Sequence, residues 1–454
     1  MVKYSFSKCV NKDNLGACGA DKFNNNINKI ENDKYNNLNM NNMDNNELYG
    51  FEKHDETITN YRVLSLFSGM GGMDIGFAEQ VVVHKNSIKE TNYIDLHPLT
   101  DHRSGDLPSL ALRRSGASTQ TNRNASEDVM LFSGAQAKEN TPLCSVDPLE
   151  IEDFVNLKKL PFEIVFQNDI LPEAKRITEL NKWNHNFHLK DIRDLLKENF
   201  DFPNAEVIIG GFPCQDFSHA GKRKGFDSNR GTLYQSYIEV INRVKPLIFV
   251  AENVNGLLTM PGEPIKKIIE DFSKVGYEVK YQLIKCEEYG IPQTRWRVII
   301  IGVRSDKHHK LPENWNIIDE NKISCTVGCY FKHLQEPNIS TDPAQTVYSK
   351  AARLEKGQGQ KEIGLNEFAP TMRAEHHGNI EFRRITNGKN NEPKMLERRL
   401  SVREAALIQT FPPSCILTEP NKPTGKAYKP IGNAVPPLLS YIIARKVQQL
   451  LILI

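Results

Sequence analysis

Short apolar runs alternate with amphipathic stretches along the middle of the chain. The runs VLSLF, FEIVFQ, AEVIIG, LIFVAEN, YEVKYQLIKC and RVIIIGV have the length and residue types of buried strands. Between them lie MDIGFAEQ, PEAKRITELN, GTLYQSYIEVINRV and GEPIKKIIEDFSKV, which have the pattern of helices. Buried strands separated by helices predict an α/β sheet covered on both faces. We expect YEVKYQLIKC and RVIIIGV to form a pair of strands.

The pattern is interrupted in three places, which divide the chain into regions. Residues 1–60 are rich in asparagine and poor in core residues, so we expect a disordered leader. Residues 85–155 show no sustained period and are interpreted as an exposed insertion. Residues 304–397 carry short apolar runs, glycines and prolines, which indicate a separate small domain. Residues 61–303 and 398–454 are expected to form the main domain, closed by the helices SVREAALIQTF and PPLLSYIIARKVQQLLILI.

Composition excludes several classes of protein. The 454 residues are 39% hydrophobic and 25% charged, and no apolar run approaches the roughly 20 residues that span a bilayer. The first residues lack the apolar core of a signal peptide. Eight cysteines without a framework spacing predict free thiols in a reducing compartment, and therefore a cytoplasmic protein. A net charge of +2 neither requires nor excludes a nucleic acid partner.

One cysteine pair invites a metal-site interpretation. Cys325 and Cys329 are four residues apart, and His333 is nearby. Zinc sites in proteins usually combine two such pairs at regular spacing. Because no second pair follows here, the sequence predicts no metal.

A glycine turn follows the first strand. In LFSGMGGMDIG the strand ends, the glycines form a turn and a helix begins, an arrangement in which backbone N–H groups can meet a ligand. The pattern is not GxGxxG, so a dinucleotide is not implied. The next strand ends at Asp169, whose carboxylate can accept hydrogen bonds from ribose hydroxyls. Asp169 can equally cap the helix that begins near Pro172.

The stretch GGFPCQDFS ends another strand and raises the question of what Cys214 does. Most free cysteines are small buried hydrophobes. Pro213 restricts the backbone before Cys214, and the preceding glycines allow close approach of the backbone to a ligand. The following segment is polar, glycine-rich and basic, which is typical of a mobile loop that closes on a polyanion; its basic residues include Lys222, Lys224 and Arg230.

Two further segments place charged groups near the same edge of the sheet. Glu252, in AENV, follows a buried strand, at the carboxyl edge where active sites of open α/β sheets lie. Arg295 and Arg297, in QTRWRV, are two residues apart and therefore lie on one face of a strand. A thiol, an acid and two arginines in one crevice predict nucleophilic attack on a substrate that is protonated or held as an anion.

These segments together resemble the DNA (cytosine-5) methyltransferases of bacterial restriction–modification systems. LFSGMGGMDIGF is similar to the motif that holds S-adenosylmethionine, and GGFPCQDFS to the Pro-Cys motif with the catalytic cysteine. ENV, QTRWRV, RRLSVREAALIQTFP and IGNAVPP are similar to later motifs in the family's order. The resemblance covers roughly residues 60–84 and 160–450. The insertion and the leader are additions that remove no motif residue.

The resemblance implies a Rossmann-like, S-adenosylmethionine-dependent catalytic domain and a smaller, irregular target recognition domain. It implies that Cys214 adds to a cytosine, that Glu252 contacts the base, and that Arg295 and Arg297 orient the base and the cysteine loop. S-adenosylmethionine is the sole cofactor expected. The resemblance implies that it is bound by Phe67, Gly69, Gly71, Asp169, Asp191, Ile192, Pro213 and Asn433.

The resemblance also implies a partner, double-stranded DNA, from which the target cytosine is flipped out. DNA contacts are expected from the cysteine loop and the recognition domain, at Gln215, Ser218, Lys222, Lys224, Arg230, Arg353, Arg373 and Arg383. We expect a monomer without membrane contact, paired with a restriction endonuclease for the same site. The alternatives are a tRNA cytosine-5 methyltransferase of the same superfamily, which shares the Pro-Cys and Glu-Asn-Val motifs, and a catalytically silent relative, which would be expected to lose Cys214 or Glu252.

Overall fold

The computed structural model describes most of the main domain and part of the remainder of the chain. The described residues belong to one compact unit, Thr59–Ile454. For 129–130 and 383–384 the backbone alone is described. The predicted leader, up to residue 59, and most of the predicted insertion lie outside the described residues. The described ranges are 60–89, 129–130, 153–213, 232–319, 322–332, 334–349, 362–374, 383–384, 398–419 and 421–454.

A seven-stranded sheet contains all six of the strands predicted from the apolar runs. Five neighbouring strands are parallel, and β11 is antiparallel to both of its neighbours, so the predicted pair β9–β11 is confirmed. The seventh strand is the short edge strand β6. The order across the sheet is β6 (Phe187–Leu189), β5 (Phe162–Asp169), β1 (Tyr61–Leu66), β7 (Val207–Gly210), β8 (Ile248–Val254), β11 (Trp296–Arg304) and β9 (Tyr277–Lys285).

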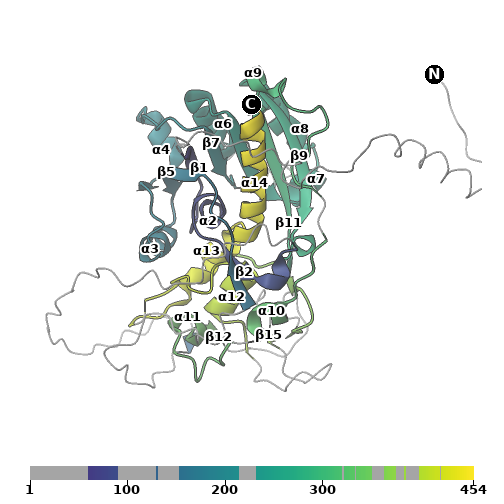
Figure 1. The fold of residues 1–454 in the computed structure, drawn as a ribbon. Helices are drawn as coiled ribbons and strands as arrows, with labels where there is room; N and C mark the ends of the chain where they lie inside the picture. Colours follow the sequence, from purple (N-terminus) through teal and green to yellow (C-terminus); the bar gives the residue numbers. More distant parts are fainter. Residues whose placement is uncertain are drawn as a thin grey trace, which may run out of the picture. The chain divides into compact units, whose positions relative to one another are not determined.

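Helices cover both faces of this sheet, as the fully apolar strands require. Successive residues of a strand enter opposite cores: Val207 and Ile209 pack in one hydrophobic cluster, and Ile208 packs in the other. On the first face lie α2 (Gly72–Ala78) and α14 (Pro437–Leu453); on the second lie α4 (Ile192–Lys197), α6 (Thr232–Val244) and α8 (Pro264–Lys274) (Figure 1). The fold class predicted from the sequence is confirmed.

The C-terminal helix α14 packs closely on α2, the first helix among the described residues. A Cβ atom at Gly76 would lie 2.4 Å from the backbone nitrogen of Tyr441, so only glycine permits this contact. Ser440 donates its hydroxyl to the carbonyl of Met73 at 2.7 Å. The end of the chain is thereby held beside the turn that follows β1. Among the described residues, no helix has both the length and the apolarity needed to cross a bilayer.

The two ends of the predicted insertion are joined by a small antiparallel ladder. The strands β2 (Val82–His84) and β4 (Phe154–Asn156) pair in register, with His84 opposite Phe154. The short helix η1 (Lys85–Ser87) follows β2. Within the predicted insertion, β3 (Val129–Met130) pairs with β12 (Tyr348–Ser349).

The described part of residues 322–433 consists of short elements, which gather near the N-terminal end of α14 (Figure 1). Buried ion pairs connect its segments: the Arg398 guanidinium contacts Glu404 at 2.8 Å and Glu336 at 3.2 Å. The remaining elements of the structure are α3 (Pro172–Leu180), α7 (Gly256–Thr259), η4 (Cys286–Glu288), β10 (Gln293–Thr294), α9 (Ser305–His308), α10 (Val327–Phe331), α11 (Pro343–Thr346), β13 (Glu362–Ile363), β14 (Ala369–Pro370), β15 (Arg383–Arg384), α12 (Val402–Ile408), η6 (Gly425–Ala427) and α13 (Tyr428–Asn433).

Candidate active site

The strand order reverses at β1. The strands β5 and β6 lie on one side of β1, and β7 and β8 lie on the other, so the connections diverge at the carboxyl ends of β1 and β7. Ligands of open α/β sheets bind in the crevice at such a point. A cavity of about 1040 Å³ opens here. Its wall includes these predicted site residues: Phe67, Gly69, Asp169, Asp191, Ile192, Pro213, Glu252, Arg295, Arg297, Arg373 and Asn433.

The turn after β1 depends on backbone conformations that most residues avoid. Phe67, Gly69 and Gly71 have φ angles of 53°, 55° and 85°. The N–H group of Gly71 donates to the carbonyl of Ser68 at 3.0 Å, which closes the turn. Space beside Gly69 is open, since an added Cβ atom would meet nothing within 4 Å. Gly71 is not part of the cavity wall and stands at the N-cap of α2, so its predicted cofactor contact stays a prediction.

Asp169 fixes this turn from the neighbouring strand. One carboxylate oxygen accepts the N–H of Gly69 at 2.8 Å, and the other accepts the N–H of Leu171 at 2.8 Å. The second bond forms a turn just before α3, whose N-cap is Leu171 and which has no side-chain cap, so the helix-capping interpretation of Asp169 is wrong. Burial raises the pKa of Asp169, and the backbone N–H groups act in the opposite direction. Each carboxylate oxygen can accept a second hydrogen bond, so these two backbone contacts leave capacity for a ligand on the cavity side.

Asp191 and Ile192 form a second part of the wall. Asp191 caps α4 by accepting the N–H of Arg193 at 2.9 Å, and the Arg193 side chain holds the same carboxylate. These hydrogen bonds lower the pKa of Asp191. Ile192 is 1% exposed and belongs to the core beneath. Asn433, the last residue of α13, is exposed and reaches the cavity from the other end of the chain.

The glycines before Cys214 are required by neighbouring protein atoms. A Cβ atom at Gly210 would lie 2.5 Å from the carbonyl oxygen of Leu66, and one at Gly211 would lie 3.0 Å from the carboxylate of Glu252. The sequence analysis explained these glycines by approach to a ligand, and the structure adds approach to β1 and to Glu252. Asn253 donates its amide to the carbonyl of Phe212 at 3.2 Å.

The cysteine itself lies outside the described residues. The described chain ends with Pro213 and resumes at residue 232. Pro213 is exposed in the cavity wall, so the segment that carries Cys214 leaves β7 beside Glu252. The predicted DNA-contacting residues of that segment are likewise outside the described residues; they are Gln215, Ser218, Lys222, Lys224 and Arg230.

Glu252 and Arg297 form an ion pair in the cavity wall. Their strands pair in antiparallel register, which places Glu252 opposite Ile299 and Arg297 opposite Val254. The guanidinium Nε lies 2.6 Å from a carboxylate oxygen of Glu252, and the two side chains are only 10% and 11% exposed. A second nitrogen of Arg297 donates to the carbonyl of Trp296 at 2.8 Å. The glutamate is therefore fixed in place at the mouth of a largely buried site.

Arg295 serves as a clamp on backbone carbonyls. Its guanidinium donates to the carbonyl oxygens of Met372 at 2.9 Å, Gly432 at 3.2 Å and Ala434 at 2.9 Å. Burial lowers the pKa of Arg295, and the nearby charge of Arg297 adds to the effect. Its Nε atom is buried and has no partner among the described residues. Arg295 thus joins three distant segments of the cavity wall, whereas the sequence suggested direct handling of the base.

Two glutamines that the sequence analysis did not single out complete this clamp. The Gln293 amide donates to Gln409 at 2.6 Å, and its oxygen accepts the N–H of Met372 at 2.9 Å. Gln409 in turn donates to the carbonyl of Ile431 at 2.6 Å. Both glutamines lie within segments quoted as motifs, next to the expected residues, and both are buried. The sequence signal available for finding them was a polar residue within an otherwise recognisable motif.

The predicted recognition residues are described only in part. Arg373 lies in the cavity wall, next to the Met372 carbonyl that Arg295 holds. Arg383 lies in β15, for which the backbone alone is described. Arg353 is outside the described residues. The contacts of these three arginines with DNA therefore stay predictions.

A buried carboxyl group lies directly beneath the glycine turn. Asp74, in the first turn of α2, is fully buried and accepts hydrogen bonds from Ser65 and Gln167, each at 2.6 Å. Burial raises the pKa of Asp74 to about 6, although both hydrogen bonds act in the opposite direction. The native state therefore binds a proton between about pH 4 and pH 6 that the unfolded chain has released.

This difference predicts a pH-dependent contribution to stability. The free energy of unfolding should fall as pH rises through this window, by up to about 3 kcal/mol from Asp74 alone. Asp74→Asn should remove this pH dependence. The free energy of unfolding of the variant, minus that of the parent chain, should therefore be larger at pH 8 than at pH 4.5. Urea unfolding of both proteins at the two pH values measures this, with Asp201→Asn, at an exposed site, as the matched control. An equal difference between Asp74→Asn and the parent at both pH values would contradict it.

Comparison with known proteins identifies the class of enzyme. The family model described as C-5 cytosine-specific DNA methylase matches residues 154–449. The chain therefore belongs to the C-5 cytosine-specific DNA methylase family and is a DNA cytosine-5 methyltransferase. The resemblance stated from the motifs, and the activity predicted from it, are confirmed.

Individual relatives narrow the class to type II restriction–modification systems. The chain is 36% identical over 315 residues to the Type II methyltransferase M.BspRI of Lysinibacillus sphaericus, covering 63% of this chain and 70% of that protein. It is 32% identical over 414 residues to the Type II methyltransferase M.BsuRI of Bacillus subtilis, covering 87% of this chain and 80% of that protein.

Solved structures share the fold. The crystal structure of S. pombe Dnmt2 methyltransferase superimposes with a TM-score of 0.52 at 16% identity, covering 86% of this chain and 99% of that chain. A putative DNA modification methyltransferase encoded within an E. coli prophage gives a TM-score of 0.51 at 18% identity, with the same coverage of both chains.

Proposed function

We propose that this enzyme transfers the methyl group of S-adenosylmethionine to carbon 5 of a flipped-out cytosine in a specific duplex sequence, through a covalent Cys214 adduct. The observation that carries this proposal is the Glu252–Arg297 ion pair beside Pro213, at the same cavity as the glycine turn and Asp169. Glu252, which would bind the base, Pro213, which precedes Cys214, and a cavity of about 1040 Å³ lie together at one edge of the sheet.

The cavity residues fit S-adenosylmethionine. The open space beside Gly69 admits a ligand against the turn, and Asp169 has acceptor capacity for ribose hydroxyls. Ile192 and the ring of Phe67 provide apolar surface for an adenine, and Asp191 and Asn433 provide polar groups around it. When bound, S-adenosylmethionine supplies an electrophilic methyl group on a sulfonium.

The chain's own residues would then make carbon 5 nucleophilic. The Cys214 thiolate adds to carbon 6 of the cytosine, and the electron pair of the 5,6 double bond moves toward carbon 5 and the ring. Glu252 contacts ring nitrogen 3 and the exocyclic amine; a proton that it supplies at ring nitrogen 3 offsets the negative charge that builds there as sulfur adds, and Arg297 holds Glu252 in that position. After methylation a base removes the carbon 5 proton, and the Cys214–carbon bond breaks.

Access to carbon 6 requires that the cytosine leave the base stack, at a cost of a few kcal/mol. The basic residues Lys222, Lys224 and Arg230, with Gln215 and Ser218, would hold the backbone around the vacated position. Arg353, Arg373 and Arg383 would read base edges from residues 304–397, since arginine can clamp guanine with two hydrogen bonds. We further propose that the enzyme acts as a monomer and protects host DNA from an endonuclease for the same site.

A labelled-cofactor assay tests this function. Incubation with methyl-labelled S-adenosylmethionine should place label in duplex DNA that contains the site, and none in tRNA. Bisulfite sequencing of genomic DNA from a host that expresses the chain should show 5-methylcytosine at one short sequence, absent from the host with an empty vector. Label in tRNA but not in duplex DNA would contradict the proposal, and so would a folded enzyme that labels DNA at adenine or at the cytosine amine.

A further inference from the structure

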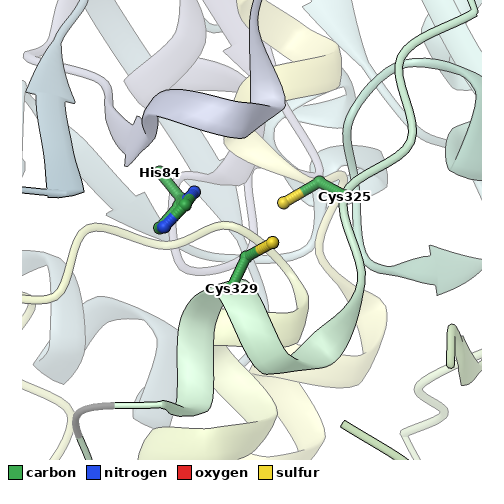
Figure 2. A group of neighbouring side chains, drawn as sticks. All are labelled: His84, Cys325 and Cys329. Atoms are coloured by element: carbon green, nitrogen blue, oxygen red, sulfur yellow. The ribbon is translucent and has the colours of Figure 1, made fainter. Parts of the chain in front are cut away.

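A cluster of two cysteines and a histidine lies apart from the cavity described above. His84 ends β2, Cys325 lies just before α10, and Cys329 lies within α10. Figure 2 shows the imidazole and the two sulfur atoms turned toward one another. The ligand atoms of all three side chains lie within 4.8 Å of one another. None of the three belongs to the cavity wall at β1 and β7.

We propose that His84, Cys325 and Cys329 bind one thiophilic divalent cation, of which zinc is the best match. Two thiolates and an imidazole are ligands that zinc prefers. In a tetrahedral site with zinc–sulfur bonds of about 2.3 Å, sulfur atoms lie about 3.8 Å apart. All three ligand atoms already lie within 4.8 Å of one another, about 1 Å more than this value at most. Loss of both thiol protons to solvent would leave the centre electrically neutral.

The surroundings of His84 favour a ligand role over simple packing. Its Nδ1 accepts the backbone N–H of Asn86 at 3.1 Å, so Nδ1 carries the lone pair and Nε2 the proton. Nε2 lies 4.0 Å from the Asp153 carboxylate. A carboxylate near the second ring nitrogen is the usual companion of a metal-bound histidine, because it fixes the tautomer. We assign Nδ1 as the ligand: binding there would replace the hydrogen bond from the Asn86 backbone N–H, and Nε2 would keep its proton on the side of Asp153.

Two of the three ligands are buried, and the third, Cys329, is accessible to solvent. His84 and Cys325 are 4% and 1% exposed, with Phe154 and Tyr330 packed against the imidazole ring at centroid distances of 5.6 and 6.0 Å. Cys329 is half-buried, and the Asn86 side-chain amide lies 3.8 Å from its sulfur. A solvent molecule at Cys329 can therefore complete a tetrahedron of three protein ligands. His333 lies outside the described residues.

Sequence spacing alone does not predict this site. The two cysteines are four residues apart without a second pair, and the third ligand comes from a strand near the start of the fold. The cation would fasten the β2–η1 segment to α10, next to the contact between the Ser87 and Tyr330 hydroxyls at 2.9 Å. It would thereby hold the region proposed to read DNA against the catalytic sheet. The role is structural and separate from methyl transfer.

Cobalt(II) titration of the full-length, freshly reduced and chelator-treated protein tests the proposal. We expect one equivalent of cobalt per chain, a sulfur-to-cobalt charge-transfer band, and displacement of that band by zinc. Cys325→Ser, Cys329→Ser and His84→Gln should lose stoichiometric binding. Cys214→Ala should retain it, which separates this site from the proposed catalytic thiol. Zinc should raise the midpoint of thermal unfolding of the parent chain and leave that of Cys325→Ser unchanged.

A second measurement keeps the test decisive if the variants fold poorly. In the parent chain, zinc should protect Cys329 from alkylation, mapped by mass spectrometry, while Cys214 stays reactive. Absence of stoichiometric binding, retention of the cobalt band in folded Cys325→Ser, or unchanged alkylation of Cys329 would overturn the proposal. A Cys325–Cys329 disulfide that reforms in the freshly reduced protein in preference to zinc binding would overturn it too.

Discussion

Replacing Cys214 with alanine is expected to reduce methyl transfer by about 10⁴-fold or more while leaving cofactor affinity nearly unchanged. The proposed thiolate makes carbon 5 nucleophilic, and alanine offers no atom that can add to carbon 6. The proposed cofactor pocket lies at other residues of the cavity wall, in the β1 turn and at Asp169 and Ile192. Single-turnover transfer of labelled methyl groups measures the first quantity, and calorimetric titration with S-adenosylmethionine measures the second.

The covalent step itself can be trapped. Duplex DNA with 5-fluorocytosine at the target position should give a slow-migrating band on a denaturing gel with the parent enzyme, because fluorine blocks the elimination. Cys214→Ala should give no such band. Cys18→Ala, in the asparagine-rich N-terminal segment and outside every motif, is the matched control and should behave as the parent does. Substantial methylation by Cys214→Ala would exclude the proposed mechanism.

Replacing Glu252 with glutamine is expected to lower the rate of methyl transfer by about 10²- to 10⁴-fold. The change keeps the size of the side chain but removes its charge, and with it the ion pair to Arg297 at 2.6 Å. A glutamine amide can still donate a hydrogen bond to ring nitrogen 3, but it has no proton to give up as negative charge builds there. The loss should therefore fall mainly on kcat rather than on KM for DNA.

The matched control is Glu278→Gln, at an exposed position of β9, which should leave both constants unchanged. The yield of the 5-fluorocytosine adduct should fall together with the rate in Glu252→Gln, since the proposed role precedes methyl transfer. A variant that forms the adduct at the parental rate would place Glu252 outside the addition step.

Most of the sheet could be predicted from the sequence because its inner strands are buried on both faces. Such strands appear as continuous apolar runs, of which VIIG in β7 and IFVAENV in β8 are examples. The edge strand β6 has only three residues, and its burial is partial, so it leaves no comparable run. The pairing of β2 with β4 was also beyond prediction, because it joins segments separated by the whole insertion.

The candidate site also contains residues whose place could be predicted from the sequence and residues whose role could not. Glu252, Asp169 and the glycine turn could be located because they directly follow apolar strands, and the carboxyl ends of parallel strands meet at one edge. The role of Arg295 could not be read from its position, since its partners are backbone carbonyls of Met372, Gly432 and Ala434. Carbonyl groups carry no residue identity, so a clamp of this kind has no sequence pattern. The same holds for His84 beside Cys325 and Cys329.

The ladder between β2 and β4 has a consequence for protein engineering. The ladder places the two ends of the predicted insertion side by side, with Val82 opposite Asn156 and His84 opposite Phe154. The distance between these anchor points is set by the ladder and not by the length of chain between them, and closing a longer loop costs little. The segment between β2 and β4 is therefore an insertion site. A reporter or a second DNA-binding module could be inserted there while β1 and β5 keep their register.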